Sequence, residues 1–297
     1  MDANPPVVLT IAGFDPSSGA GITADIKTIA AHGCYGVSCI TALTVQSTRG
    51  VRRVEGVDPK IIAETLQELV SDIAVEAVHI GMLGNERVVA AVADFLDDSA
   101  GAFPENARLP HVVLDPILKS SSGADLLDAA GTKLLLERLI PLAEVITPNL
   151  DEASVLTGMA VTNLDQMREA AARLHALGAA NVVVTGGHLS KGEKAIDLLS
   201  FKTDRGTEQE IFKADRQRSS STHGTGCAFA TALACHLAHG RGLPEAVLLS
   251  KVYVSAAIAN AHPLGHGAGP LHHLYRMGQE RRPSAIISET EHVHSRT

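Results

Sequence analysis

Short apolar runs alternate with helical stretches along most of this chain, and that alternation restricts its fold more than any other feature. The apolar run Val7–Ala12 ends at Gly13, and the helical stretch Gly21–His32 follows it. Where helices separate successive strands in this way, the strands form a parallel sheet with helices on both faces. The sequence therefore predicts an α/β protein with a mostly parallel central sheet.

The remaining elements continue the pattern. Further strands are predicted at Val37–Val45, Ala77–Gly81, His111–Leu114, Val145–Thr147 and Val182–Thr185. Helices are predicted at Asp58–Asp72, Glu86–Leu96, Thr132–Ile140, Asp151–Gly158, Leu164–Leu177, Cys227–His239 and Pro244–His262. Ile196–Lys202 and Thr207–Lys213 resemble a polar, solvent-facing β-hairpin.

No linker or shift in composition divides the 297 residues. We therefore expect one domain over residues 1–280, with a surface loop at Asp97–Pro110 and a flexible polar tail over 281–297.

The amino-acid composition restricts the classes of molecule that this chain is expected to bind. The formal net charge is -8, aromatic residues make up 3% and tryptophan is absent, so neither a basic surface nor stacking side chains for nucleic acid are expected. The chain shows no apolar run long enough to span a membrane and no signal segment at its N-terminus, which predicts a cytoplasmic protein without a membrane partner. A small-molecule substrate is favoured.

Cysteine and histidine spacing gives no metal or disulfide pattern. The four cysteines form neither a disulfide framework nor a CxxC pair, so we expect free thiols at Cys34, Cys39, Cys227 and Cys235. The fourteen histidines match no zinc motif, and we expect loop and surface positions for those near the end, His262, His266, His272 and His273.

The glycine-rich segment Gly13–Gly21 joins the first strand to the first helix, at the sheet edge where α/β folds bind ligands. Its Gly19–Ala24 part matches the dinucleotide pattern GxGxxA, but Gln46 stands where that pattern expects an acidic residue. No Walker GxxxxGK[ST] pattern occurs in the chain. A ligand-binding loop and a simple tight turn both remain open for this segment.

His223–Cys227 reads HGTGC and precedes an alanine-rich helix. Backbone amides at such a helix start converge on an anion, assisted by the helix dipole, so Gly224 and Gly226 would help to stabilise a phosphate or a developing negative charge. The same field is expected to lower the pKa of Cys227. The alternative is that Cys227 is only a small buried residue at a tight helix start.

Polar side chains follow two further strands. Asn149 and Glu152 are three residues apart and can face one point, where Mg²⁺ would suit their oxygen atoms. A capping box explains the same spacing equally well. Asp115 follows another strand and adds a second carboxylate at the same sheet edge, unless it is only a loop aspartate.

Together, these motifs resemble the hydroxymethylpyrimidine and phosphomethylpyrimidine kinases of thiamine biosynthesis, which have a ribokinase-like fold. The resemblance runs from about Val7 to Tyr275 through TIAGFDPSSGAGITADIKT, ITALTVQSTRGV, IGML, VVLDP, ITPNLDEA, VVVTGGH, HGTGC and GHGAGPLHH. It implies a three-layer α/β/α fold, a homodimer, and ATP- and Mg²⁺-dependent phosphorylation of a pyrimidine alcohol and then of its monophosphate.

The resemblance also implies functions for single residues. Gly13, Asp25, Gln46 and Met82 would surround the pyrimidine, with Gln46 bonded to its ring nitrogen and amino group. Asn149 and Glu152 would organise Mg²⁺, joined by Asp115. The ATP phosphates would lie against Asn149, Thr185, Gly187, Thr222, Thr225 and Lys251. Cys227 would lie at the acceptor hydroxyl and act as the base, and Gly224 and Gly226 would belong to the same catalytic loop.

The chain departs from the family pattern in two places. Phe14 and Ser18 replace residues that are usually smaller in the first loop. Thr185 stands where some members have a lysine that contacts phosphate, so neutralisation of charge would depend more on Mg²⁺, the helix start and Lys251.

Two alternatives remain. A pyridoxal or pyridoxine kinase has the same fold and a similar GTGC loop, although the amide of Gln46 suits an aminopyrimidine better. A regulator that binds a small ligand without turnover would keep the pocket, but it would not need Asn149, Glu152 and Cys227.

Overall fold

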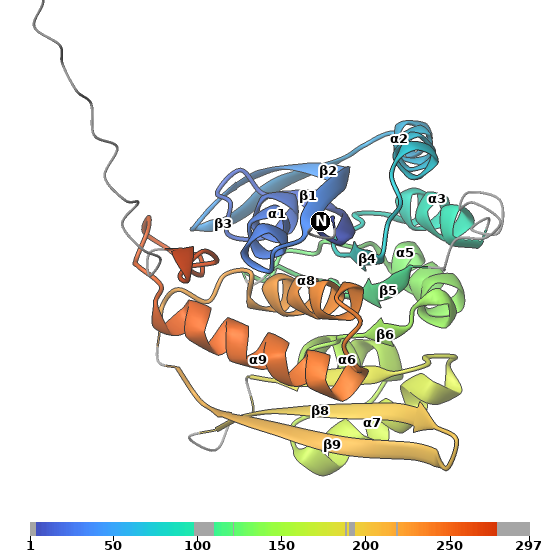
Figure 1. Ribbon diagram of the computed structural model, residues 1–297, viewed down its shortest axis with the longest axis vertical. Coiled ribbons are helices and arrows are strands. Elements are labelled where there is room, and N and C mark those ends of the chain that lie inside the picture. The colour runs from blue at the N-terminus through green and yellow to red at the C-terminus, as the bar shows by residue number, and fades with distance from the viewer. Residues whose placement is uncertain are drawn as a thin grey trace, which may run out of the picture.

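Nine strands form one sheet in the part of the chain that this computed structural model describes, residues 4–97, 110–120, 122–187, 189, 194–217 and 219–277. The spatial order is β3-β2-β1-β4-β5-β6-β7-β8-β9 (Figure 1). The strands are β1 Val7–Phe14, β2 Tyr35–Ser47, β3 Gly50–Gly56, β4 Ala77–Ile80, β5 His111–Leu114, β6 Val145–Ile146, β7 Val182–Gly186, β8 Lys194–Thr203 and β9 Gly206–Asp215. Strands β2, β1, β4, β5, β6 and β7 run parallel in the centre, while β3, β8 and β9 pair antiparallel at the two edges.

Helices cover both faces of this sheet, which confirms the predicted three-layer α/β/α arrangement (Figure 1). They are α1 Gly21–Ala31, α2 Pro59–Asp72, α3 Glu86–Asp97, α5 Ala129–Leu134, α6 Leu150–Thr157, α7 Leu164–Ala176, α8 Thr225–Ala238 and α9 Leu243–Ala259. A π-helical turn, Leu135–Leu139, and a 3₁₀ turn, Ile140–Leu142, continue α5.

Alternation along the strands divides the core into two layers, because successive side chains point to opposite faces of a sheet. Leu9 and Ile11 belong to the layer packed against α2, α3, α6 and α7. Val8 belongs to the other layer, together with the strand residues Ala77, Val113, Val145 and Val183 and the alanine-rich helix α8. Burying each of the larger aliphatic side chains contributes about 1.5–3 kcal/mol, so both layers are needed for stability.

The predicted elements differ from the structure at the sheet edges. Strand β3 was not predicted, because its sequence GVRRVEG is mostly polar and exposed, as an edge strand permits. The hairpin prediction was right for β8 and β9, but the solvent-facing description was wrong for β8. The run from Asp197 to Ser200 is buried, because β8 pairs with β7 and extends the central sheet.

Two helix predictions also need correction. The helix predicted at Thr132–Ile140 begins earlier, at Ala129, and changes to π-helical and 3₁₀ turns. Helix α8 begins at Thr225 instead of Cys227, so Cys227 lies within its first turn. The predicted tail over 281–297 and most of the Asp97–Pro110 loop lie outside the described residues.

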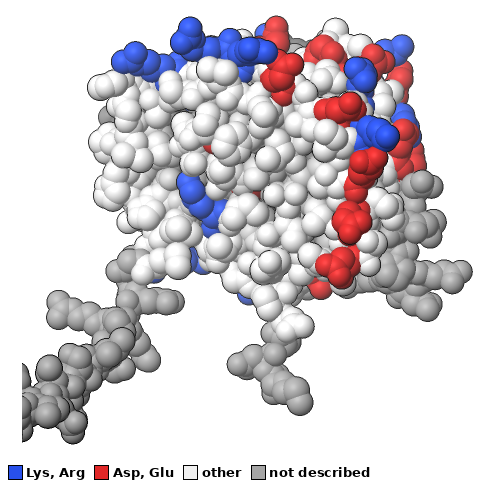
Figure 2. All heavy atoms as spheres, turned by 90° about the horizontal axis from the view of Figure 1, so that it is seen from above, with Lys and Arg blue, Asp and Glu red and all other residues white. Residues whose placement is uncertain are grey.

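Charged side chains are unevenly spread on the face seen in Figure 2, where they gather along the upper and right-hand margins and leave the middle largely uncharged. The four cysteines are free thiols, as predicted. None of the helices in the described ranges is long and apolar enough to cross a membrane.

Candidate active site

Three of the predicted site residues lie where parallel strands end. Asp115 directly follows β5, Asn149 follows β6, and Thr185 lies in the last part of β7. Asn149 and Thr185 form an isolated parallel bridge, and the Thr185 amide donates to the carbonyl of Pro148 over 2.9 Å. The carboxyl edge of the sheet therefore brings together residues that lie far apart in the sequence.

The two glycine loops are in direct contact. Gly224, the N-cap of α8, has φ +81°, and a Cβ there would lie 1.9 Å from the carbonyl oxygen of Gly19. A Cβ on Gly19 would in turn lie 2.3 Å from Cδ2 of His223. A side chain on Gly224 would therefore meet the backbone of the first loop, and a side chain on Gly19 would meet the imidazole ring of His223, so glycine fits both positions without a shift. The first turn of α8 therefore begins against the loop that follows β1.

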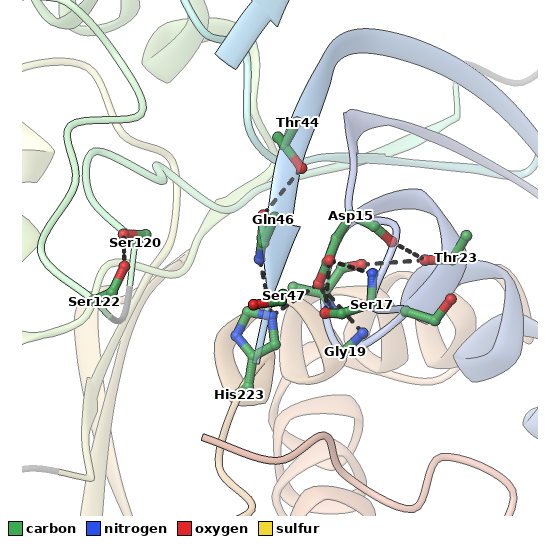
Figure 3. A network of polar contacts seen from close by, with 12 residues as sticks. Asp15, Ser17, Gly19, Thr23, Thr44, Gln46, Ser47, Ser120, Ser122 and His223 are labelled. Atoms are coloured by element: carbon green, nitrogen blue, oxygen red, sulfur yellow. Dashed lines mark hydrogen bonds and ion pairs between the residues drawn. The ribbon is translucent and has the colours of Figure 1, made fainter. Parts of the chain in front are cut away.

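Asp15 and His223 connect these loops (Figure 3). Oδ1 of Asp15 accepts hydrogen bonds from the amide and hydroxyl of Ser17 over 2.8 and 2.7 Å, and Oδ2 lies 2.8 Å from Nε2 of His223. Burial alone would raise the pKa of Asp15, but the bonds from His223 and Ser17 hold it below its usual value. The sequence analysis did not single out Asp15, although its place after a buried strand is the same signal that indicated Asp115.

Gln46 reaches the same histidine from β2. Its Nε2 lies 3.2 Å from Nε2 of His223, and its Oε1 accepts a hydrogen bond of 3.1 Å from the Thr44 hydroxyl (Figure 3). Gln46 and His223 also line a cavity of about 150 Å³. The amide predicted to contact the substrate therefore lies beside the HGTGC loop.

The other three residues that the resemblance placed around the pyrimidine lie in two groups. Gly13 and Met82 are adjacent, since a Cβ on Gly13 would lie 2.9 Å from the Met82 sulfur. Asp25 is fully buried, and its carboxylate oxygens accept bonds from the hydroxyls of Thr10 and Thr231 over 2.7 and 3.0 Å. Asp25 therefore lies within the core, and both of its carboxylate oxygens already accept hydrogen bonds from other side chains of the protein.

Buried acids surround the first turn of α8. Burial, together with the charge of Asp25, raises the pKa of Asp115 to about 6, despite the opposing effect of His79. Burial and the nearby Asp115 carboxylate raise the pKa of Glu152 well above its usual value. A Cβ on Gly226 would lie 3.5 Å from Oδ2 of Asp115, which puts this acid next to the turn that holds Cys227.

The prediction of a lowered pKa for Cys227 was wrong. Burial of the thiol, and then the carboxylates of Asp115 and Asp25, raise this pKa well above its usual value, although the Gly21 amide opposes them by donating to the sulfur. The dipole of α8 favours the thiolate, but loss of hydration and two nearby negative charges outweigh it.

Asn149 and Glu152 form the capping box of α6. Oδ1 of Asn149 accepts the amide of Glu152 over 2.9 Å, and Oε2 of Glu152 accepts the amide of Asn149 over the same distance. Within the described ranges, no three His, Cys, Asp or Glu side chains are grouped as a metal site. The capping interpretation is therefore confirmed, and a part in binding Mg²⁺ stays a prediction.

Lys251, predicted to contact the ATP phosphates, forms an ion pair within the protein. Its Nζ is 2.5 Å from Oδ2 of Asp197, and Oδ1 of Asp197 accepts the amide of Gly186 over 3.0 Å. Lys251 also lines a largely apolar cavity of about 340 Å³ with residues of β9 and α9 that include Phe212, Leu248 and Val252. Asp197, which the sequence analysis did not consider, therefore links this second cavity to the end of β7.

The remaining residues predicted to contact ATP lie just after β7 and at the start of α8. Gly187 is exposed just after β7, and a Cβ there would meet no atom within 4 Å. The hydroxyl of Thr225 donates to the carbonyl of Thr222 over 2.7 Å, which closes the turn before α8. Both turns border the edge of the sheet at which the glycine loops meet.

Comparison with known proteins agrees with this geometry. The family model described as phosphomethylpyrimidine kinase matches residues 15–272. The chain is 42% identical over 275 residues to hydroxymethylpyrimidine/phosphomethylpyrimidine kinase of Streptomyces coelicolor, covering 93% of this chain and 97% of that one. It is 45% identical to the thiamine biosynthesis bifunctional protein ThiED of Geobacter sulfurreducens, with 90% of this chain covered, but it spans only about half, 52%, of that protein.

Solved structures show the same fold. Phosphomethylpyrimidine kinase of Clostridium difficile superposes with a TM-score of 0.72 at 37% identity, covering 85% of this chain and 99% of that one. Pyridoxal kinase of Bacillus subtilis, solved as an ADP complex, gives 0.80 at 34% identity over 92% of this chain and 99% of that one.

Proposed function

This chain belongs to the phosphomethylpyrimidine kinase family, and we propose that it uses ATP to phosphorylate 4-amino-5-hydroxymethyl-2-methylpyrimidine and then its monophosphate, for thiamine biosynthesis. The observation that carries the proposal is the contact between the two glycine loops, where Gln46 lies beside His223 and Cys227 lies in the helix turn that follows. An amide that suits an aminopyrimidine thus lies near the amides of a helix start that suit a phosphoryl group.

The larger cavity is the proposed site of the ATP base. Its apolar walls fit a flat ring, and Lys213 supplies positive charge at its border. The Lys251–Asp197–Gly186 chain leads from this cavity to the end of β7, near Thr185 and Gly187. The phosphates would follow this edge to the first turn of α8.

Mg²⁺ fits the neighbouring acids. Asp115 and Glu152 are both buried, and the Asp115 carboxylate disfavours the charged form of Glu152, which is the electrostatic situation that a divalent cation relieves. Asn149 and Glu152 would hold the hydrated ion, with Asp115 nearby. When bound, the ion would neutralise charge on the ATP phosphates.

Cys227 is the proposed base. Its sulfur accepts a hydrogen bond from the Gly21 amide and would take the proton of the acceptor hydroxyl as that oxygen attacks the terminal phosphorus of ATP, with ADP leaving. The amides of Gly224, Thr225 and Gly226 would face the phosphoryl group during transfer. Because carboxylates raise the pKa of Cys227, a cation bound at Asp115 and Glu152 would favour the thiolate.

Pyridoxal kinase is the second candidate, favoured by the TM-score of 0.80 to the Bacillus subtilis enzyme. Gln46 argues for the pyrimidine, because its amide can both donate to and accept from an aminopyrimidine edge. A ligand-binding regulator without turnover is the third candidate, and it would leave the buried acids and Cys227 without a use.

Product analysis after incubation with ATP, Mg²⁺ and either the pyrimidine alcohol or pyridoxine tests the proposal. We expect the pyrimidine monophosphate to form and then to be converted to the diphosphate. Faster conversion of pyridoxine would favour the second candidate, and ligand binding without ADP release would favour the third. A homodimer and a cytoplasmic location stay predictions, the first supported by the exposed apolar side chains of Leu43 and Val45 on β2.

A further inference from the structure

The cavity of about 150 Å³ has an unusual lining for an acidic protein. The chain has a formal net charge of -8, yet the residues around this cavity include no carboxylate within the described ranges, and Arg49 supplies a full positive charge. The other polar lining residues carry amide, hydroxyl or imidazole groups, namely Gln46, Ser47, Thr48, Ser120, Ser122 and His223. The lining therefore favours an anion.

The turn that bears Arg49 is held between two other loops. The amide of His266 donates to the Thr48 hydroxyl over 3.3 Å, and a Cβ on Gly267 would lie 1.9 Å from the Thr48 carbonyl oxygen. On the opposite side, a Cβ on Gly50 would lie 2.8 Å from the Ser122 hydroxyl. Close packing at Thr48 and Gly50 thus fixes the backbone on each side of Arg49.

The guanidinium of Arg49 is exposed, and it has no hydrogen-bond or ion-pair partner among the residues that the structure describes. On the same hairpin, Arg53 is paired with Glu55 over 2.5 Å, so an acidic partner was available nearby in sequence. Arg49 lines the cavity instead, and its guanidinium remains available for an oxyanion, which it can bind in a bidentate manner.

Hydroxyl groups complete the lining. Ser120 and Ser122 are 2.9 Å apart through their Oγ atoms and lie across from Gln46 and Ser47 in Figure 3. His223 borders the same space and immediately precedes Gly224, the N-cap of α8. An anion held here would therefore remain beside the helix start at which phosphoryl transfer is proposed.

We propose that this cavity, with Arg49 as its charged group, binds the phosphate of the monophosphate acceptor and so distinguishes the second phosphorylation from the first. The inference rests on the proposed function. A phosphate monoester carries a charge of about -1.5 to -2 at pH 7, whereas the alcohol is neutral, so a cation at this position assists only the second acceptor. Arg49 acts on binding of the acceptor and takes no part in proton transfer.

The test compares Arg49→Gln with the wild type on each acceptor separately, measuring kcat and KM from product formation. Arg52→Gln is the matched control, because Arg52 is an exposed arginine of the same hairpin that does not line the cavity. We expect Arg49→Gln to raise KM for the monophosphate by roughly 10- to 100-fold and to change KM for the alcohol less than about twofold. Arg49→Lys should give an intermediate KM for the monophosphate, since it keeps the charge but loses the bidentate geometry.

Equal effects of Arg49→Gln on both acceptors, or an effect matched by Arg52→Gln, would overturn the inference while leaving the proposed function intact. A wild-type protein that phosphorylates neither acceptor would instead contradict the proposed function. Thermal melts of the variants accompany the kinetics, and we expect unchanged melting because Arg49 is exposed. If Arg49→Gln unfolds at a lower temperature than the wild type, the Arg49→Lys variant is used instead. Lysine keeps the charge but cannot bind an oxyanion in a bidentate manner, so wild-type KM values for both acceptors in Arg49→Lys would also overturn the inference.

Discussion

Oδ2 of Asp15 lies 2.8 Å from Nε2 of His223, although 208 positions separate the two residues. This contact joins the loop after β1 to the turn before α8, and Gln46 approaches the same ring nitrogen from β2. Three segments of the chain thus meet at one imidazole. The site is assembled by tertiary contacts, and each of the following experiments perturbs one part of it.

Gln46→Leu should impair use of the pyrimidine and spare ATP. The leucine leaves the polar edge of the bound ring without a partner, which costs about 1–3 kcal/mol in kcat/KM. Steady-state kinetics with each substrate varied in turn would measure it. Equal losses for pyrimidine and ATP would show that Gln46 supports the loop through His223 and does not contact the substrate.

Cys227→Ser should lower kcat by roughly 10²- to 10⁴-fold with little change in KM for ATP, the range for loss of a general base. Because the pKa of Cys227 is raised, its thiolate becomes more abundant as pH increases, so the wild-type rate should rise with pH above neutrality. The serine variant should lose that rise. Wild-type turnover in the serine variant would show that Cys227 is not the base and serves only as a small residue at the helix start.

Glu152→Gln should separate metal binding from capping. Glutamine can still accept the amide of Asn149, so the capping box and the melting temperature should persist. The variant should have a low kcat that recovers partly as Mg²⁺ is raised, because mass action offsets weaker binding. Turnover is titrated with Mg²⁺ alongside thermal melts.

The matched control is Asn163→Ala, which removes the N-cap of α7, where Oδ1 of Asn163 accepts the amide of Gln166 over 3.0 Å. It should lose about 1 kcal/mol of stability with no change in Mg²⁺ dependence. The same behaviour from Glu152→Gln would leave capping as the whole contribution of Glu152.

Asp115→Asn should stabilise the metal-free protein more at high pH than at low pH. The pKa of Asp115 rises from 3.8 to about 6 on folding, so its favourable contribution is complete below about pH 4 and is lost as pH rises through 6. Asparagine removes that loss, which is on the order of 3 kcal/mol. Urea unfolding without Mg²⁺ at about pH 4.5 and pH 8 gives the comparison, and an equal effect at the two pH values would contradict it.

Lys251→Met should destabilise the protein by about 3–5 kcal/mol, because it leaves the Asp197 carboxylate buried without its cation. Adding Asp197→Asn removes that charge while keeping an acceptor for the Gly186 amide, and should restore most of the loss. Lys60→Met, in the exposed pair with Glu64, should cost less than about 0.5 kcal/mol. Urea unfolding of the four proteins tests the ranking, and no recovery in the double variant would contradict it.

Most of the central fold could be predicted from the sequence, because the apolar runs of β1, β4, β5 and β7 are short, nearly free of charge and separated by helices. Edge strand β3 could not be, since Arg52, Arg53 and Glu55 are ordinary residues for a strand with one exposed side but resemble a loop in sequence. β8 carries buried Asp197 and Ser200, whose polar character concealed its place in the core.

The candidate site was predicted in part. Gly224 and Gly226 and the capping box of Asn149 and Glu152 are local patterns, and local spacing is sufficient to indicate them. The direction of the pKa shift at Cys227 depends on Asp115 and Asp25, which approach from β5 and α1. Spacing along the chain carries no information about such distances, so the helix dipole alone led to the wrong sign.

The core layer that contains Val8, Ala77, Val113, Val145 and Val183 is covered by α1, α8 and α9. The last two helices begin at Thr225 and Leu243, whereas the strands that they cover are complete by Gly186. During synthesis on a ribosome, one apolar face of the sheet must therefore wait, largely uncovered, until the final quarter of the chain emerges. A truncated chain that ends before α8 would leave this apolar face of the sheet exposed to water. Such a chain would be prone to aggregation and would be bound by chaperones or degraded by proteases, and it would not be a smaller enzyme.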